Sequence, residues 1–360
     1  MTEKSLTASH LSVAMTTDEI GKESTTGGNC VTSSSLLGDK FRWEYAVIFI
    51  GVVGVAGNAL ILYALVASKQ HKKHALIFNQ NALDLFGSFF LVVMYVVEIY
   101  NIRLTGVLGY WLCMVLLSGN LIWWGTNGSM INLAIITIDR YLMVVYPVRS
   151  KKWLRPWVIY SAVAFAWFVS IAYNTILVFS SSAVVDGVCY GYSFFDSYAA
   201  KVASVIFYIS FFYFIILAIF IFCYGRILVA IRRQARAMAS HGTPASSTSQ
   251  AQSHKIQTNV IKTMILVSAF YAIAWLPYNI YYLLVSTQLV PTLTFFDSGY
   301  YVATFLAFFY TSANPFIYAT KFNPVRKILR KMIPCKKKPV QPIDVAATTT
   351  GERRIGDTGN

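Results

Sequence analysis

The sequence is poor in charge. Only 12% of its 360 residues are Asp, Glu, Lys or Arg, and only 15 are acidic. Because soluble domains carry about 25% charged residues, this composition excludes an ordinary soluble fold. Hydrophobic residues make up 56% of the chain, and the mean hydropathy is +0.55. The sequence therefore predicts an integral membrane protein.

Residue spacings typical of metal sites and catalytic sites are also missing. The sequence has no His-Glu-x-x-His, no paired deep aspartates and no Gly-x-Ser-x-Gly with a deep histidine, which argues against an enzyme. We find no internal repeat and no ionisable path at mid-membrane, so a transporter or channel is only a remote alternative. The cysteines form no zinc-type cluster and are spread singly at Cys30, Cys113, Cys189, Cys223 and Cys335.

Seven apolar segments each supply the roughly 20 residues that cross a membrane as a helix. They show no period-2 alternation, so a β-barrel is excluded and an all-α bundle of seven transmembrane helices is predicted. The segments are approximately 45–67, 75–100, 111–145, 157–179, 199–231, 260–285 and 299–318.

The basic residues lie mostly on one side of these segments. The connections after helices one, three and five, together with the tail, hold 24 of the 30 Lys and Arg residues. The positive-inside rule places this side in the cytoplasm, so the N-terminus is outside. The distribution explains the net charge of +15 without a nucleic-acid partner.

The composition also predicts the domain boundaries. Residues 1–44 are polar and predict a disordered extracellular tail, and 45–320 form the membrane domain. Residues 321–335 predict an amphipathic eighth helix on the cytoplasmic leaflet, because Val325 and Ile328 share one face and basic residues fill the other. Residues 336–360 predict a disordered cytoplasmic tail. Cys335 is either a palmitoylation site or an unmodified cysteine.

The apolar run 128–147 contains Asp139-Arg140-Tyr141. Charges inside such a run either mark function or reach water at a helix end. Further polar or proline motifs occur once per helix, at Gly57-Asn58, Asn79 to Asp84, Trp275-Leu-Pro277 and Asn314-Pro-Phe-Ile-Tyr318. Together, and in this order, they resemble those of the rhodopsin-like (class A) G-protein-coupled receptors over residues 45–335.

The resemblance implies a multi-pass receptor of the plasma membrane that is not an enzyme. Such a receptor binds an extracellular ligand and activates a heterotrimeric G protein by outward movement of helix six. Membrane lipids, arrestin and receptor kinases are further partners that the resemblance implies.

The resemblance also assigns roles to individual residues. Arg140 is the switch arginine, held by Asp139 at rest; a guanidinium stays charged and needs a partner in every state. The expected G-protein switch consists of Asp139, Arg140, Tyr141, Tyr224, Tyr318, Pro147 and Val148. The expected activation core consists of Trp275, Pro277, Tyr271, Asn314 and Pro315.

Two further features follow from the resemblance. Asp84, Ser129, Asn314 and Asn58 match a sodium and water site, although a protonated Asp84 bonded to Asn314 is the alternative. No other cofactor is required. Cys113 and Cys189 match the family's extracellular disulfide, and Cys30 is left over.

Four departures from the family pattern are evident. The interval from Cys113 to Arg140 is two residues too long, so helix three either starts differently or bulges in its outer turn. Ile216 replaces the usual proline of helix five, Gln257 stands near the place of the acid that locks helix six, and Tyr271 replaces a phenylalanine.

The outer half is rich in aromatic residues. Ile122 stands where amine receptors carry an aspartate, and Phe308 where opsins carry the retinal-binding lysine, so neither a monoamine nor retinal is expected. A small neuropeptide is favoured, with a lipid or another small molecule as the alternative. The candidate ligand residues, which could instead be packing or interface residues, are Glu98, Ile122, Trp123, Tyr278, Asn279, Tyr282, Tyr301 and Phe308.

Overall fold

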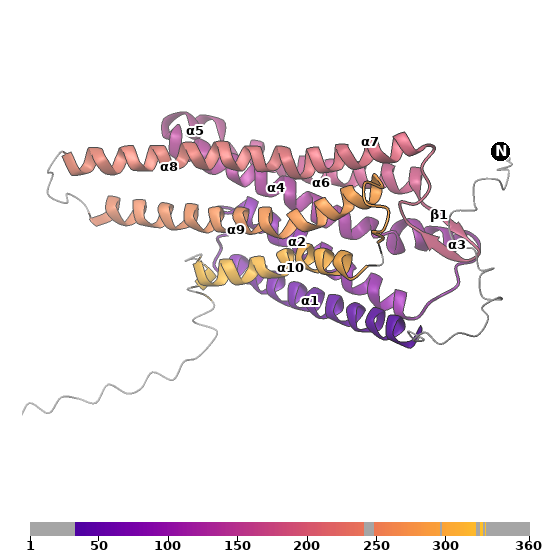
Figure 1. The fold of residues 1–360 in the computed structure, drawn as a ribbon. Helices are drawn as coiled ribbons and strands as arrows, with labels where there is room; N and C mark the ends of the chain where they lie inside the picture. The colour runs from indigo at the N-terminus through magenta and orange to yellow at the C-terminus, as the bar shows by residue number, and fades with distance from the viewer. Residues whose placement is uncertain (1–32, 241–247, 296, 322–324, 327, 329–360) are drawn as a thin grey trace, which may run out of the picture. The chain divides into compact units, whose positions relative to one another are not determined.

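The structure is a computed structural model that describes residues 33–240, 248–295, 297–321, 325–326 and 328 (Figure 1). The chain divides into two compact units, Met1–Tyr45 and Ala46–Asn360. The described part of the first unit is the start of α1. The predictions for residues 1–32, for the tail 336–360 and for Cys335 lie outside the described residues.

Long helices dominate the described residues. In chain order the elements are α1 (Ser33–Ala67), α2 (Ala75–Ile99), α3 (Gly106–Leu112), the π-helical turn η1 (Cys113–Leu117), α4 (Asn120–Val145), α5 (Pro147–Trp153), α6 (Pro156–Ser181), the strands β1 (Ala183–Val185) and β2 (Val188–Tyr190), α7 (Tyr198–Ile209), the π-helical turn η2 (Ser210–Ile215), α8 (Ile216–Ser240), α9 (Thr248–Ser286) and α10 (Ser298–Lys321).

Six helical segments of the described chain are long and apolar enough to cross a membrane. The seventh predicted span, α10, has 24 residues, about 36 Å of helix at 1.5 Å per residue. It is less apolar because it carries Thr311, Ser312 and Asn314, which are all buried in the protein. Polar groups that face the protein interior are compatible with a transmembrane helix.

Three helices begin or end beyond the predicted boundaries. Helix α1 begins at Ser33, inside the tail that we predicted as disordered to residue 44, because no proline and a single glycine, Gly38, interrupt 33–44. Helix α8 continues to Ser240 and α9 begins at Thr248, well beyond the predicted limits of 231 and 260. The stretch 234–239 is rich in Ala and other helix formers, which favour continuation of α8 to Ser240.

Helix α4 is the central element of the second unit and packs against α2, α6 and α8, while α9 packs against α10. The crossing of α2 and α4 depends on glycine. A Cβ atom added at Gly125 would lie 2.6 Å from the backbone nitrogen of Gly87. This close approach brings Asp84 of α2 and Ser129 of α4, four residues or fewer away from the crossing, into hydrogen-bonding distance.

The outer part of helix three accommodates the two additional residues. Helix α3 runs into the π-helical turn η1, and the chain then breaks at Ser118 and Gly119 before α4 begins. Gly119 has φ +73°, a left-handed conformation that glycine adopts without strain. The outer turn therefore bulges, which decides between the two alternatives for the long Cys113–Arg140 interval.

A short antiparallel hairpin, β1–β2, lies in the second outer loop and was missing from the all-α prediction. Its turn is Asp186-Gly187, with φ of +50° and +79°. Asp-Gly between β-branched residues is a strong hairpin pattern, so the sequence contained the information. The backbone nitrogen of Leu104 donates to the carbonyl of Gly187 at 2.9 Å and joins the first outer loop to this turn.

Little of the predicted eighth helix is described. Val325 is fully buried in the same hydrophobic core as Tyr318, and Ile328 packs against that core. These two residues of the predicted apolar face therefore contact protein.

Candidate functional site

Arg140 lies near the inner end of α4 and pairs with its neighbour. Its Nε is 3.4 Å from Oδ2 of Asp139, and the two side chains are 15% and 5% exposed. Tyr141 packs against Tyr146 and Phe222 instead. The structure thus places Arg140 beside Asp139, and the role of this pair as the resting state of a switch stays a prediction from the resemblance.

His74, directly before α2, is close enough to Arg140 to feel its charge. Burial, followed by the charges of Arg140 and Lys73, lowers the pKa of His74 from 6.5 to about 4. His74 is therefore neutral at physiological pH and adds no positive charge beside the arginine.

The Tyr224 hydroxyl joins three helices just above this pair. It lies 3.0 Å from Thr137 Oγ1 on α4 and 3.0 Å from Ser268 Oγ on α9. Tyr318 of α10 is fully buried nearby in the same core. Gln257 lies on α9, but its side chain is outside the described residues. Hydrogen bonds among the uncharged hydroxyls of Thr137, Tyr224 and Ser268 thus connect α9 to α4 and α8.

Pro147 is the first residue of α5, where its missing N–H costs no hydrogen bond. Val148 follows it and is 84% exposed. The docking role that the resemblance implies for Pro147 and Val148 stays a prediction.

Asp84 is buried at the centre of the bundle, 1% exposed, and accepts hydrogen bonds from three helices. Oδ1 accepts from the Ser129 hydroxyl at 2.6 Å, and Oδ2 accepts from Nδ2 of Asn314 at 3.0 Å. Nε2 of Gln80 lies 3.5 Å from Oδ2 and also donates to Ser129 Oγ. The structure therefore brings together three of the four residues that we assigned to the sodium site.

Asn58, the fourth residue, bonds elsewhere. Its amide nitrogen donates to the carbonyls of Gly54 and Thr311, which ties α1 to α10. Hard cations bind through oxygen atoms, yet Gln80 directs an amide nitrogen at both Asp84 and Ser129. The groups present do not fit a sodium ion in this arrangement, and sodium binding stays a prediction from the resemblance.

Two of the departures from the family pattern meet in space. In the π-helical turn η2 the Ile216 N–H donates to the carbonyl of Tyr213, so the carbonyl of Phe212 receives a bond from another helix. Its donor is the hydroxyl of Tyr271 on α9. The Tyr213 hydroxyl in turn donates to the carbonyl of Ala272 at 2.9 Å. Helix five therefore bulges without a proline, and Tyr271 satisfies the exposed carbonyl.

An aromatic cluster surrounds Trp123 of α4 in the outer half. Its ring centroid lies 6.1 Å from Tyr208, 6.2 Å from Trp275, 5.9 Å from Tyr278 and 6.2 Å from Phe308. Four helical segments, α4, α7, α9 and α10, thus contribute rings to one cluster. Tyr282 extends the cluster through Tyr278, at 5.9 Å.

Three buried hydroxyls adjoin this cluster: those of Tyr173 on α6, Tyr192 after β2 and Tyr208 on α7. Among the described residues, none of the three hydroxyls has a hydrogen-bond partner. The Tyr173 and Tyr208 rings lie 6.4 Å apart, and Tyr208 meets Tyr282 at 6.0 Å. Burial raises the pKa of Tyr192, and the neighbouring Tyr282 and Tyr173 raise it further.

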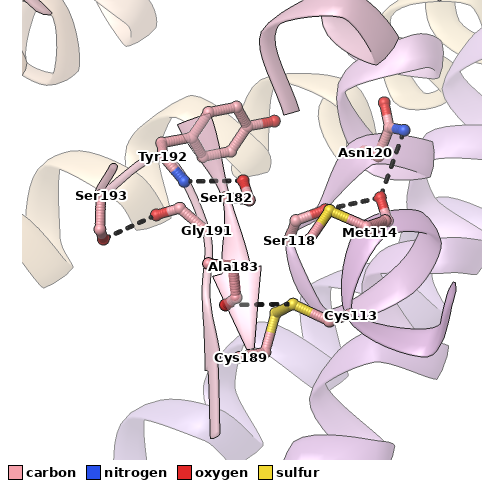
Figure 2. The surroundings of a disulfide bond; sticks show 10 residues. All are labelled: Cys113, Met114, Ser118, Asn120, Ser182, Ala183, Cys189, Gly191, Tyr192 and Ser193. Atoms are coloured by element: carbon pink, nitrogen blue, oxygen red, sulfur yellow. Dashed lines mark hydrogen bonds between the residues drawn. A yellow bond between two sulfur atoms is a disulfide. The ribbon is translucent and has the colours of Figure 1, made fainter. Parts of the chain in front are cut away.

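The disulfide places Tyr192. Cys113 of η1 and Cys189 of β2 are bonded, 2.02 Å between sulfurs, which confirms the predicted pair (Figure 2). Figure 2 also shows the backbone nitrogen of Tyr192 donating to Ser182 Oγ at 3.0 Å. Tyr192 has φ +56°, a left-handed conformation that costs energy for a residue with a side chain. These attachments direct the loop after β2 inward.

The remaining ligand candidates are less closely associated with the cluster. Asn279 donates to the carbonyl of Trp275 on its own helix at 2.7 Å, and Tyr301 packs on Tyr300. Ile122 is 3% exposed, and Glu98 lies at the end of α2.

Comparison with known proteins identifies the family. The sequence profile described as "7 transmembrane receptor (rhodopsin family)" matches residues 57–318, which is most of the chain. The chain belongs to this receptor family. It is therefore a multi-pass receptor of the plasma membrane with seven transmembrane helices, as predicted, and it is not an enzyme.

The receptor is similar to melanopsins and to receptors for somatostatin and allatostatin A. It is 28% identical to melanopsin-B of Gadus morhua over 305 residues, covering 81% of this chain and 48% of that one. It is 25% identical to somatostatin receptor type 5 of Bos taurus, covering 81% and 75%, and 25% identical to the allatostatin-A receptor of Bombyx mori, covering 80% and 78%. The receptor thus spans about half the length of the cod melanopsin that it matches.

The fold of the receptor is similar to that of squid rhodopsin. The TM-score is 0.66 at 19% sequence identity, with 85% of this chain and 87% of that chain covered. This agreement confirms the fold.

Sequence reasoning missed four residues of the receptor's site: Gln80, Tyr173, Tyr192 and Tyr208. Gln80 could have been found, because it lies four residues before Asp84 and so on the same helical face. The three tyrosines carry no such pattern, since different helices and a loop bring them together.

Proposed function

We propose that this receptor binds a peptide whose uncharged, amide-bearing end contacts the aromatic cluster, and that it then activates a heterotrimeric G protein. The observation that supports a peptide most directly is the group of buried hydroxyls of Tyr173, Tyr192 and Tyr208, which have no partner in the described part of the chain. A buried polar group without a partner costs about 1–3 kcal/mol. Peptide amides would supply partners, whereas a lipid tail would leave these hydroxyls unpaired.

The sequence of the segments that supply the rings of the cluster supports an uncharged ligand group. The chain segments that supply its rings contain no Asp, Glu, His, Lys or Arg, namely residues 119–138, 157–181, 202–225, 263–296 and 298–320. Asp297, at the outer start of α10, is engaged, since its Oδ2 accepts from the Tyr281 hydroxyl at 2.9 Å and from the Thr294 backbone. These bonds, the Thr294 bond first, lower the pKa of Asp297.

The residues of α9 and α10 do not favour retinal as the ligand. Phe308 is 8% exposed and packs on Trp123, and residues 263–320 contain no lysine. A Schiff base needs a lysine amine. The similarity to somatostatin and allatostatin-A receptors supports a peptide instead.

Nucleotide exchange on purified G proteins tests this proposal. The probes are somatostatin, allatostatin A, a panel of short peptides and, separately, a panel of lipids. We expect exchange with a peptide probe. Tyr173→Phe and Tyr208→Phe should then weaken its potency roughly tenfold each, since a lost hydrogen bond is worth about 1–1.5 kcal/mol.

Tyr190→Phe is the matched control, because Tyr190 is 43% exposed on the same hairpin that carries Cys189. The peptide probe should be as potent on this variant as on the unaltered receptor. A receptor that responds to a lipid probe alone, with equal potency in the Tyr173→Phe and Tyr208→Phe variants, would contradict the peptide proposal.

For the G-protein side we propose that Arg140 exchanges Asp139 for a partner at the inner face when α9 moves outward. Movement of α9 must break the Tyr224–Ser268 contact, because these residues lie on different helices. Val148, exposed at the start of α5, then contacts the G protein. Two discrete partners for one permanently charged group make a two-state element that a distant ligand can bias.

The hydroxyl of Tyr271 should restrain this movement. We expect Tyr271→Phe to raise ligand-independent nucleotide exchange about fivefold, because it removes one bond of about 1 kcal/mol between α9 and η2. Basal exchange is measured at equal receptor density, with Tyr160→Phe, an exposed position on α6, as the control. Unchanged or lower basal exchange in Tyr271→Phe would show that the bond does not restrain α9.

A further inference from the structure

The hydrogen bonds that lead to Asp84 have a fixed direction. The indole nitrogen of Trp167 can only donate, and it donates to Oδ1 of Asn79 at 2.9 Å. Asn79 Nδ2 therefore donates onward to Oδ1 of Asn132 at 3.0 Å. Asn132 Nδ2 donates to the Leu76 carbonyl at 2.9 Å and to Oε1 of Gln80 at 2.8 Å.

This direction fixes the orientation of the Gln80 amide. Its oxygen faces Asn132, so its nitrogen must face Asp84 and Ser129. The orientation of a side-chain amide is usually a choice, but here a group that can only donate and a carbonyl that can only accept decide it. Gln80 is fully buried, so water does not compete for its nitrogen.

We propose that the Gln80 amide takes the place of a bound cation at Asp84, so that this receptor keeps its buried carboxylate without sodium. The nitrogen reaches Asp84 and Ser129 together, two of the residues that a sodium ion would have to share. The described hydrogen bonds to the carboxylate are donated by side chains on three helices, α2, α4 and α10. Hydrogen bonds to the charged form favour it, and bonds in a chain polarise one another.

The test measures thermal unfolding of the purified full-length receptor in sodium chloride and in N-methyl-D-glucamine chloride. We expect the unaltered receptor to unfold at the same temperature in both salts. Gln80→Ala removes the nitrogen and leaves room beside Asp84, so its unfolding temperature should be roughly 2–5 °C higher in sodium. Asp84→Asn added to Gln80→Ala should abolish that difference.

Asn81→Ala is the matched control, because Asn81 is also a fully buried amide on α2 but donates to the carbonyl of Ile77 on its own helix. It should gain no sodium dependence. An unaltered receptor that sodium stabilises, with the effect lost in Asp84→Asn, would overturn the proposal without any Gln80 variant. A folded Gln80→Ala receptor whose unfolding temperature is the same in both salts would also overturn the proposal, because Asp84 would then be protonated. If Gln80→Ala fails to fold, Gln80→Ser provides the same comparison.

Discussion

Arg140→Ala should abolish ligand-stimulated nucleotide exchange while the receptor still reaches the cell surface. Charge-assisted hydrogen bonds are worth about 1.5–3 kcal/mol each, so the loss of one lowers exchange at least about tenfold and the loss of two lowers it more than about 100-fold. Exchange and surface abundance are measured on the same cells. Arg140→Lys should not restore activity, because an ammonium lacks the planar five-donor geometry of guanidinium.

Loss of Arg140 also leaves the Asp139 carboxylate buried without its charged partner, which lowers stability. The double variant Asp139→Asn/Arg140→Ala separates the two effects, since it should recover thermal stability but not exchange. Arg155→Ala, at an exposed position before α6, is the charge-matched control and should signal normally. Normal exchange in Arg140→Ala would refute the switch assignment.

Removal of the Cys113–Cys189 bond should cost about 2–5 kcal/mol of stability, since it closes a loop of 76 residues. It also releases the hairpin from η1, so Tyr192 is no longer held near Tyr173 and Tyr282, which are close enough to raise its pKa. We expect Cys113→Ser to lower the unfolding temperature and to remove the response to any peptide agonist that the exchange assay identifies.

Comparison of the two single cysteine variants with the double variant provides the control for the disulfide. Cys113→Ser, Cys189→Ser and the double variant should lose the same stability, because each removes the same bond. Cys223→Ala changes a buried cysteine that is free in the described structure and should retain the agonist response. A double variant with the stability and response of the unaltered receptor would show that the disulfide has neither role.

Patterns local to one helix could be predicted from the sequence. The seven apolar segments depend on neighbouring residues, and the structure forms helices over all of them. The basic inner face and the role of Asp139-Arg140 are also local patterns, and they stay predictions. The hairpin was missed although Asp186-Gly187 marks its turn. The outward extension of α1 and the inner extensions of α8 and α9 were missed because apolar content was used to set helix limits, whereas helix formers also continue through polar sequence.

Contacts between helices were harder to predict. The bond from Tyr271 to the Phe212 carbonyl joins two positions that each looked like an isolated departure. Tyr173, Tyr192 and Tyr208 lie on α6, the loop after β2 and α7, and of these elements the disulfide attaches only the loop. No pattern within one segment therefore predicts that they approach one another. For Asn58 the sequence predicted a contact that the described structure does not have. Its motif suggested membership of the Asp84 network, but its amide nitrogen donates to backbone carbonyls.

The bond between Tyr271 and the carbonyl of Phe212 has a consequence for how the sequence can evolve. Proline at position 216 has no N–H, so a lineage that gained it would leave the Phe212 carbonyl without a backbone donor and would still need the hydroxyl at 271. A lineage that lost the hydroxyl while the helix stayed open would retain an unsatisfied carbonyl. The two positions are therefore coupled, and a survey of paired substitutions should find epistasis that single substitutions miss.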